Sequence, residues 1–221
     1  MKDLLRRLAA STEAKRVQFG EDFEAFAAEQ GLLGWEGWFH PYGEQTYQSV
    51  LQHLSPSDVV LEIGAGDLRL SLRMSQHVLR VYAVEVNPRL LGWALREIGR
   101  DLPGNVHVLC ANALEMELPP HLTAAVLLMR HCAHLSTYFD RLQAAGCWRL
   151  ITNARWKSGV EVIDLTAKRV PFAEVREGWY ACRCGAVGYV GQGERPQAIP
   201  IEVFDCPACG VQVGGEGEEA T

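Results

Sequence analysis

The sequence predicts an α/β fold: a three-layer sandwich with a mostly parallel sheet that is shortened after its fifth strand, followed by a small cysteine-based ribbon. Three observations support this prediction. An apolar run that begins at Val59 ends in the acidic Glu62 and leads into a Gly-x-Gly turn and then a helical pattern, which indicates a buried parallel strand that feeds a tight turn. A second strand pattern, over residues 80–85, closes on the acidic Glu85, where a doubly wound fold places a carboxylate. Two cysteine pairs near the C-terminal end indicate the ribbon.

The composition bounds the class of protein. The chain of 221 residues is long enough for one α/β domain and a small appendage. Its net charge of −6 excludes an overall positive field that would attract phosphates. No stretch is long and apolar enough to span a membrane, and the charged residues 1–7 lack the apolar core of a signal peptide. We therefore expect a cytoplasmic protein, in which cysteines are thiols or metal ligands.

The residues before the first strand predict helices and a loop. Residues 1–30 show the pattern of one or two amphipathic helices, and residues 31–43 form a loop rich in glycine and aromatic residues. Residues 46–54 predict a further helix. It leads to a turn over residues 55–58, because Ser-Pro-Ser-Asp is a turn sequence.

The residues after the second strand continue the alternation of helices and strands. Asn87 and Pro88 open a helix, with Asn87 as its N-cap and Pro88 at the first helical position. The pattern then predicts a third strand, an apolar fourth strand, a helix that ends at Gly146, a fifth strand and a hairpin strand. These five elements span residues 105–109, 124–129, 136–145, 147–152 and 160–165.

The glycine turn favours S-adenosylmethionine (SAM) over a dinucleotide as the ligand. Enzymes of both kinds use a strand that ends in such a turn. The third glycine of the dinucleotide pattern G-x-G-x-x-G would fall at Arg69, so that pattern is incomplete. Glu62 ends the strand, and its negative charge suits the ammonium group of SAM better than a diphosphate.

The chain resembles the class I SAM-dependent methyltransferases. The segments E-I-G-A-G, V-E-V-N-P and N-V-H-V-L-C-A-N-A-L begin at residues 62, 84 and 105. They are most similar to those of the ribosomal RNA (rRNA) adenine dimethyltransferase branch. The resemblance covers residues 58–128 and implies a Rossmann-like fold. A complete class I domain has seven strands, and the chain before the cysteines is too short for them, so we expect a shortened sheet.

The resemblance also implies a cofactor site. In the family, the turn at residues 64–66 lines the methionyl part of SAM, the acid at Glu85 binds the ribose, and the position of Asn112 meets the adenine amine. Asn112 replaces the usual Asp, and its amide oxygen can still accept a hydrogen bond, although it can also serve as a turn residue. The loop at residues 31–43 often covers the cofactor or forms an acceptor wall. The implied cofactor residues are Glu62, Gly64, Ala65, Gly66, Asp67, Glu85, Val86, Asn112, Ala113 and Met129.

The acceptor is expected at the end of the fourth strand. Amine methyltransferases of this kind carry Asn or Asp, Pro, Pro and an aromatic residue there, and residues 128–134 lack that tetrad. His131 is placed to act as a general base, and His134 would share its face if the strand turned into a helix. These two histidines are the catalytic candidates, with packing or capping as their alternative roles. Methyl transfer by SAM needs little beyond alignment.

The cysteine pairs predict a zinc ribbon. Cys182 and Cys184 form one knuckle, Cys206 and Cys209 form the other, and each pair is followed by glycine. Four thiolates fill a tetrahedral zinc site without an open position, so the metal would be structural. A disulfide or a redox pair is the alternative. The remaining cysteines are expected to be small core residues: Cys110, Cys132 and Cys147.

The chain therefore divides into four parts and favours one function. We expect an N-terminal helical segment with the aromatic loop over residues 1–54, a SAM-binding domain over 55–175, the zinc ribbon over 176–213 and a disordered acidic tail over 214–221. The favoured function is methyl transfer from SAM to a small molecule or an RNA, with S-adenosylhomocysteine as the product. A protein acceptor and a protein partner for the ribbon remain open. The alternative is a catalytically degenerate SAM-binding scaffold that presents its ribbon to a protein or a nucleic acid.

Overall fold

The computed structural model describes residues 1–14, 25–26, 28–29, 39–130, 132–155, 159–192 and 199–209 of the chain. Some sequence predictions lie outside these residues. They concern residues 15–24 of the predicted N-terminal helices, residues 31–38 of the aromatic loop, His131 and the acidic tail.

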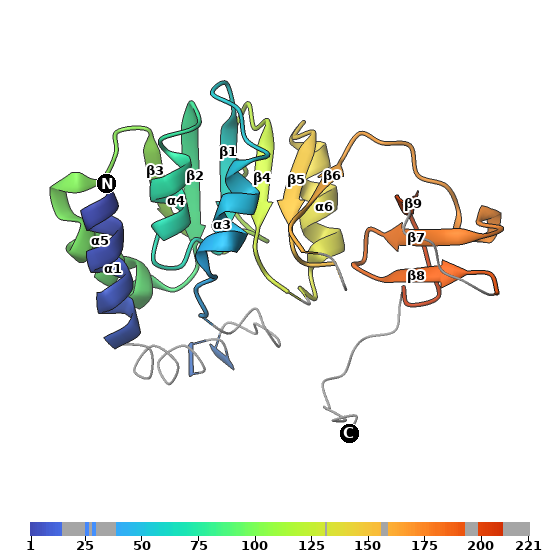
Figure 1. The fold of residues 1–221 in the computed structure, drawn as a ribbon, viewed down its shortest axis with the longest axis horizontal. Coiled ribbons are helices and arrows are strands. Elements are labelled where there is room, and N and C mark those ends of the chain that lie inside the picture. The colour runs from blue at the N-terminus through green and yellow to red at the C-terminus, as the bar shows by residue number, and fades with distance from the viewer. Residues whose placement is uncertain are drawn as a thin grey trace.

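A six-stranded sheet forms the centre of the molecule (Figure 1). Its strand order is β3-β2-β1-β4-β5-β6, and every neighbouring pair is parallel except β5 and β6. The predicted α/β fold is confirmed, and the sheet ends in β6, which pairs with β5 as an antiparallel hairpin strand. The strands are β1 (Val59–Ile63), β2 (Arg80–Glu85), β3 (Val106–Cys110), β4 (Ala124–Leu127), β5 (Arg149–Thr152) and β6 (Glu161–Asp164).

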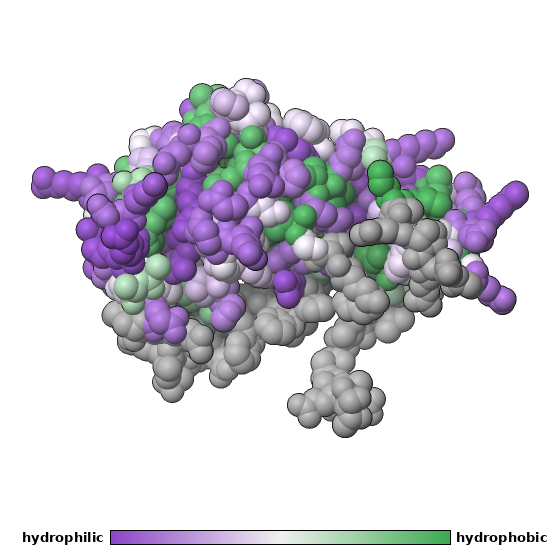
Figure 2. Space-filling model, viewed as in Figure 1, coloured by the Kyte–Doolittle hydropathy of each residue, from purple (hydrophilic) through white to green (hydrophobic). Residues whose placement is uncertain are grey.

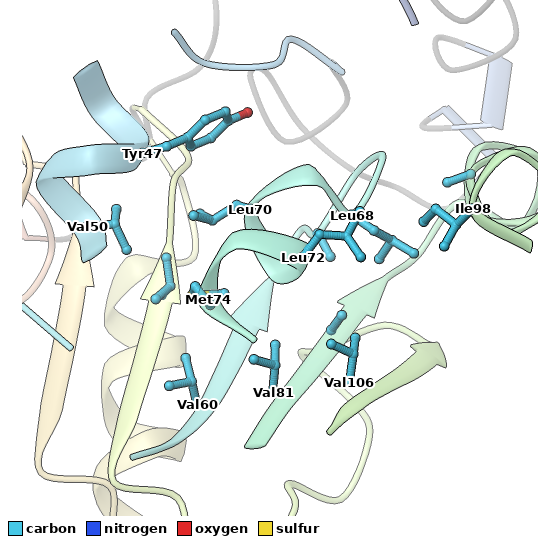
Figure 3. Close-up of a cluster of buried hydrophobic side chains, with 14 of the residues drawn as sticks. Tyr47, Val50, Val60, Leu68, Leu70, Leu72, Met74, Val81, Ile98 and Val106 are labelled. Carbon is cyan, nitrogen blue, oxygen red and sulfur yellow. The ribbon is translucent and has the colours of Figure 1, made fainter. Parts of the chain in front are cut away.

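Helices cover both faces of this sheet and give three layers. Val60 and Val81 face one side, where they pack with residues of α1, α3, α4 and α5 (Figure 3). Leu61 and Ala125 face the other side and pack against α6. The two-residue period of a strand therefore supplies two hydrophobic cores. The helices are α1 (Lys2–Ala14), α3 (Glu44–Leu51), α4 (Arg69–Met74), α5 (Pro88–Ile98) and α6 (Leu135–Ala144), with 3₁₀ turns η2 (Gly99–Asp101) and η3 (Phe172–Glu174).

Some element boundaries and one burial prediction differ from the sequence-based expectation. β4 ends at Leu127 and not at Met129, because Leu127 is the last residue of β4 that pairs with β5. Cys132 and Cys147 are buried as expected. The prediction that Cys110 lies in the core is wrong: its side chain is exposed, because it ends β3, the outermost strand of the sheet.

A second, three-stranded sheet carries the four paired cysteines. Its order is β8-β7-β9, with β7 antiparallel to β8 and parallel to β9. The smaller sheet lies beside the β6 end of the larger one (Figure 1). Val170, in the segment after β6, forms a backbone bridge with Val203 of β9, and Arg155, after β5, forms an ion pair with Glu202 of β9. The strands are β7 (Gly178–Cys182), β8 (Val187–Val190) and β9 (Ile201–Val203).

Figure 2 shows a surface that is mainly hydrophilic, with apolar residues scattered over it. Among the exposed large apolar side chains, Ile199, Ile201 and Phe204 lie in and beside β9. None of the helices in the described part of the chain has the length and hydropathy of a membrane span.

A buried carboxylate, that of Asp58, ties the amino ends of three strands together. It accepts hydrogen bonds from the Ser55 backbone N–H (2.6 Å), the Thr123 hydroxyl (2.8 Å) and the Arg149 guanidinium (2.6 Å). Burial raises the pKa of Asp58, but these hydrogen bonds and the charge of Arg149 outweigh it and hold the pKa below its ordinary value. Asp58 precedes β1, Thr123 precedes β4 and Arg149 begins β5. The hydrogen bonds among these three residues therefore fix the positions of the three strands relative to one another along their length.

We predict that Asp58→Ala destabilises the protein by about 3–5 kcal/mol, because it leaves a buried guanidinium without its partner. The free energy of unfolding from urea denaturation measures this loss. Asp3→Ala is the matched control, since the Asp3–Arg6 pair is exposed, and it should change stability by less than about 0.5 kcal/mol. Equal effects of the two substitutions would contradict the role of Asp58.

Candidate active site

A cavity of about 820 Å³ opens at the carboxyl ends of β1, β2 and β4. This is the edge at which ligands bind in doubly wound sheets. Residues 39–47, before and within α3, contribute further lining side chains. The ten residues that the sequence predicts as cofactor contacts all line this cavity: Glu62, Gly64, Ala65, Gly66, Asp67, Glu85, Val86, Asn112, Ala113 and Met129.

The glycine turn after β1 is fixed by backbone hydrogen bonds to β2. The Gly64 and Ala65 N–H groups both donate to the Val84 carbonyl, at 3.0 and 2.9 Å. Gly64 and Gly66 have φ angles of +73° and +56°, which residues other than glycine rarely adopt. A Cβ at Gly66 would also lie 2.6 Å from the Phe39 ring. Phe39, in the described part of the predicted aromatic loop, therefore packs directly against the glycine turn.

Glu85 holds this turn from the end of β2. One carboxylate oxygen accepts from the Gly66 N–H (2.8 Å) and the other from the Asn87 N–H (2.9 Å). Asn87 in turn caps α5, as the sequence predicts. Burial raises the pKa of Glu85, although its backbone hydrogen bonds oppose that shift. Because each carboxylate oxygen can accept more than one hydrogen bond, Glu85 retains acceptor capacity toward the cavity.

Two more acidic side chains, Glu62 and Asp67, line the cavity. Glu62 is 4% exposed and accepts the Ser71 hydroxyl. Burial, together with the charges of Asp67 and Glu85, raises its pKa to about 8. Asp67 is 2% exposed and pairs with Arg69. A site of this kind favours a cationic ligand, because a positive charge stabilises the ionised form of each carboxylate.

Asn112 and Met129 line the cavity from the segments that follow β3 and β4. The Asn112 amide oxygen accepts the Leu114 N–H (3.0 Å), and its nitrogen donates to Glu115. Asn112 therefore shapes the turn after β3 and lines the cavity at the same time. The Met129 methyl group lies 3.4 Å from the Cβ position of Gly64, so it faces the glycine turn.

The structure describes one of the two histidine candidates. His131 lies outside the described residues. His134 occupies the N-cap position of α6, which begins at Leu135. The catalytic roles of the two histidines therefore stay predictions.

The sequence-based site prediction misses several residues that line the cavity. Tyr47 lies on the buried face of α3, and Tyr138 lies on the buried face of α6. Their helical spacing from Val50 and Leu135 places them on inward faces, but gives no sign that these faces reach a ligand site. Thr12 is a different case: its hydroxyl donates to Asp67 from α1 (2.7 Å), and no local pattern links residues so far apart.

The four predicted metal ligands form one cluster. The sulfurs of Cys182, Cys184, Cys206 and Cys209 lie within 4.8 Å of one another, with contacts of 3.5, 3.5 and 3.8 Å between neighbours. A tetrahedral zinc site with bonds of about 2.3 Å has sulfur–sulfur edges of about 3.8 Å. The donor set therefore fits zinc. A hydrogen bond with Cys182 lowers the pKa of Cys184 to about 5, so the cluster readily holds a thiolate.

Comparison with known proteins gives relatives of one kind. No protein-family model matches the chain. The probable rRNA small subunit methyltransferase A of Methanosarcina barkeri is 39% identical over 66 residues, 30% of this chain and 22% of that protein. The rRNA small subunit methyltransferase A of Thermobifida fusca is 41% identical over 78 residues, 33% of this chain and 27% of that protein. A dimethyladenosine transferase of Kluyveromyces lactis is 33% identical over 67 residues, 30% of this chain and 21% of that protein.

The likeness is confined to part of each protein. The chain spans about a quarter of the length of the curated relatives that it matches. Among solved structures, the 23S rRNA methyltransferase ErmE is 23% identical to this chain. The match covers 50% of this chain and 46% of the ErmE chain, with a TM-score of 0.44. The resemblance predicted from the three sequence motifs is confirmed: the curated homologues of this chain are rRNA methyltransferases and dimethyladenosine transferases.

Proposed function

We propose that residues 55–175 bind SAM in the cavity and transfer its methyl group to an acceptor, and that residues 176–213 form a structural zinc ribbon. The observation that carries the first proposal is the ring of three buried carboxylates around the glycine turn, Glu62, Asp67 and Glu85. A ligand with ammonium and sulfonium charges stabilises the ionised forms of Glu62 and Glu85, whose pKa values are raised, whereas an electrically neutral ligand does not.

Each carboxylate has a distinct task in this proposal. Glu85 accepts hydrogen bonds from the two ribose hydroxyls with the acceptor capacity that Gly66 and Asn87 leave. Glu62 lies near the ammonium group, and Asp67 anchors the turn through Arg69 and Thr12. The bound cofactor supplies a methyl group on a positively charged sulfur, and the protein aligns the acceptor with it. His131 and His134 are the candidates for taking up the acceptor's proton.

The acceptor that we favour is a nucleobase amine of RNA. The curated relatives are named as rRNA methyltransferases and as dimethyladenosine transferases, and the rings of Phe39, Tyr42 and Tyr138 line the cavity and can stack on a base. A small molecule is the second candidate. It is favoured by the net charge of −6, which provides no long-range attraction for a phosphate backbone.

We predict that the wild type binds SAM with micromolar affinity and that Glu85→Ala weakens binding at least about 100-fold, because a buried charged acceptor is lost. Isothermal titration calorimetry with SAM and S-adenosylhomocysteine measures both affinities. Glu174→Ala, at an exposed glutamate outside the cavity, is the control and should bind like the wild type. Folded wild-type protein that binds neither ligand would overturn the proposal.

A second prediction concerns pH. The pKa of Glu62 is raised to about 8, so this carboxyl is mostly protonated in the empty cavity at neutral pH. A bound ammonium group favours the ionised form, and binding below pH 8 must therefore release a proton. The SAM affinity should rise with pH by up to about tenfold per unit between about pH 6 and pH 8 and then level off.

Glu62→Gln isolates this effect, because its amide oxygen can still accept the Ser71 hydroxyl but does not titrate. Calorimetry over the same pH range should give a flatter profile for Glu62→Gln than for the wild type. The ionisation of SAM itself is common to both proteins and cancels in the comparison. Parallel profiles would show that Glu62 does not face the charged ligand.

The zinc proposal predicts about one zinc ion per chain by atomic absorption, and a lower melting temperature after chelation. Cys209→Ser should reduce both the zinc content and the melting temperature. Cys110→Ser is the matched control, since Cys110 is an exposed thiol outside the cluster, and it should retain the metal. A disulfide among the four cysteines in protein purified under reducing conditions would contradict the assignment.

A further inference from the structure

The first cysteine pair lies in the turn between β7 and β8. The Gly185 N–H donates to the Cys182 carbonyl (3.0 Å), and the Cys182 N–H donates to the Ala186 carbonyl (2.9 Å). β7 and β8 pair directly beside this turn, and the proposed zinc ion would bind both Cys182 and Cys184. Residues 182–185, which we call the first knuckle, are therefore held as one rigid unit.

The first knuckle packs against the N-terminal end of α6. Gly185 has a φ of +100°, and a Cβ there would lie 3.4 Å from Cδ2 of Leu135 and 3.9 Å from the Ala154 carbonyl oxygen. Leu135 begins α6 and is buried, and Ala154 follows β5. Figure 1 shows α6 at the end of the larger sheet that faces β7 and β8. The glycine therefore lets the turn approach the helix closely.

Arg183, within the first knuckle, ties the ribbon to the same helix. Its Nη1 donates to both carboxylate oxygens of Asp140 (2.7 and 3.0 Å), and its Nε donates to the Phe204 carbonyl (3.1 Å). Asp140 lies on the exposed side of α6, and Phe204 leads from β9 to Cys206 of the second cysteine pair. Arg183 therefore links α6 to both cysteine pairs.

The helix that the first knuckle contacts also forms part of the cavity. Tyr138 lies one turn after Leu135, on the same buried face of α6, and lines the cavity. Leu128, Met129 and Arg130, in the segment between β4 and α6, line it as well. We call Tyr138 and these three residues the acceptor wall, because the acceptor is expected at this end of the sheet. Since packed interiors transmit displacements, a shift of the N-terminal end of α6 would move this wall.

We propose that the first knuckle positions the acceptor wall, with Arg183 as a positioning residue that acts through Asp140 and α6. This inference rests on the proposed function, because it gives the ribbon a task in methyl transfer. Alignment of the acceptor with the methyl group is the main requirement of that reaction, and a displacement of about 1 Å can lower the rate about 100-fold. The ribbon fulfils this task without touching the cofactor or the acceptor.

Fluorine NMR of full-length, zinc-loaded protein tests the inference. The protein is labelled with 3-fluorotyrosine and saturated with S-adenosylhomocysteine. Tyr138 and Tyr47 line the same cavity from opposite faces of the sheet, and Tyr138→Phe and Tyr47→Phe assign their signals. Arg183→Glu places like charges beside Asp140. It should shift the Tyr138 signal, leave the Tyr47 signal in place and keep the affinity for S-adenosylhomocysteine within about twofold of the wild type.

Two further variants separate positioning from a purely structural role. Asp140→Arg creates the same repulsion with an unchanged first knuckle, and it should also shift the Tyr138 signal. The double variant Arg183→Glu/Asp140→Arg restores opposite charges and should move the signal back toward its wild-type position. The ion pair is partly exposed, so all three variants should stay folded. Arg6→Glu is the matched control, since its ion pair with Asp3 belongs to α1, and it should move neither signal.

Three results would overturn the inference alone: a Tyr138 signal that stays in place in both single variants, equal shifts of the two tyrosine signals, or a shift that the double variant does not reverse. Zinc content by atomic absorption should match the wild type in Asp140→Arg, which shows that a shift there does not come from loss of the metal. A wild type that does not bind S-adenosylhomocysteine would overturn the proposed function, and this inference with it.

Discussion

The carboxylate of Glu85 is the group on which the architecture of the cavity depends. It reaches back from the end of β2 to the backbone of the turn after β1, through Gly66, and forward to the start of α5, through Asn87. A single buried side chain thus couples the end of β2, the glycine turn after β1 and the N-terminus of α5. Two buried N–H groups would be left without acceptors if it were lost, and such groups are costly in a protein interior.

The same arrangement makes the empty cavity electrostatically unfavourable. Glu62 and Glu85 both have raised pKa values, and in each case burial is the leading cause. The folded state therefore holds these groups under conditions that favour their neutral forms. Perturbed carboxyl groups of this kind are common where a protein binds a charged ligand, and their cost to stability is a usual feature of functional sites.

Much of the fold could be predicted because its signals are local. The bounds of β1 and β2, the positive φ angles of the glycines and the N-cap at Asn87 all follow from short stretches of sequence. Features that depend on distant parts of the chain were not predictable in this way. The exposure of Cys110 depends on the order of the strands, and the bond from Thr12 to Asp67 depends on how α1 packs.

The candidate site shows the same division. The motifs predicted a set of residues that the fold brings into one cavity, because each lies at or just after the carboxyl end of a strand and these ends share one edge of the sheet. Tyr47 and Tyr138 could not be predicted as cavity residues, since their helical spacing indicates only that they face the interior. Whether an inward face reaches a ligand site depends on the assembled fold.

The junction between the two sheets has a consequence for the modularity of the chain. The Arg155 side chain is 1% exposed and binds both carboxylate oxygens of Glu202, at 2.7 Å each, while Glu161 lies 3.5 Å away. A buried guanidinium with its main partner removed is strongly destabilising. Recombination could therefore not exchange the cysteine-bearing unit freely. Any replacement unit must supply a carboxylate to Arg155, and we expect the two units to evolve as a pair.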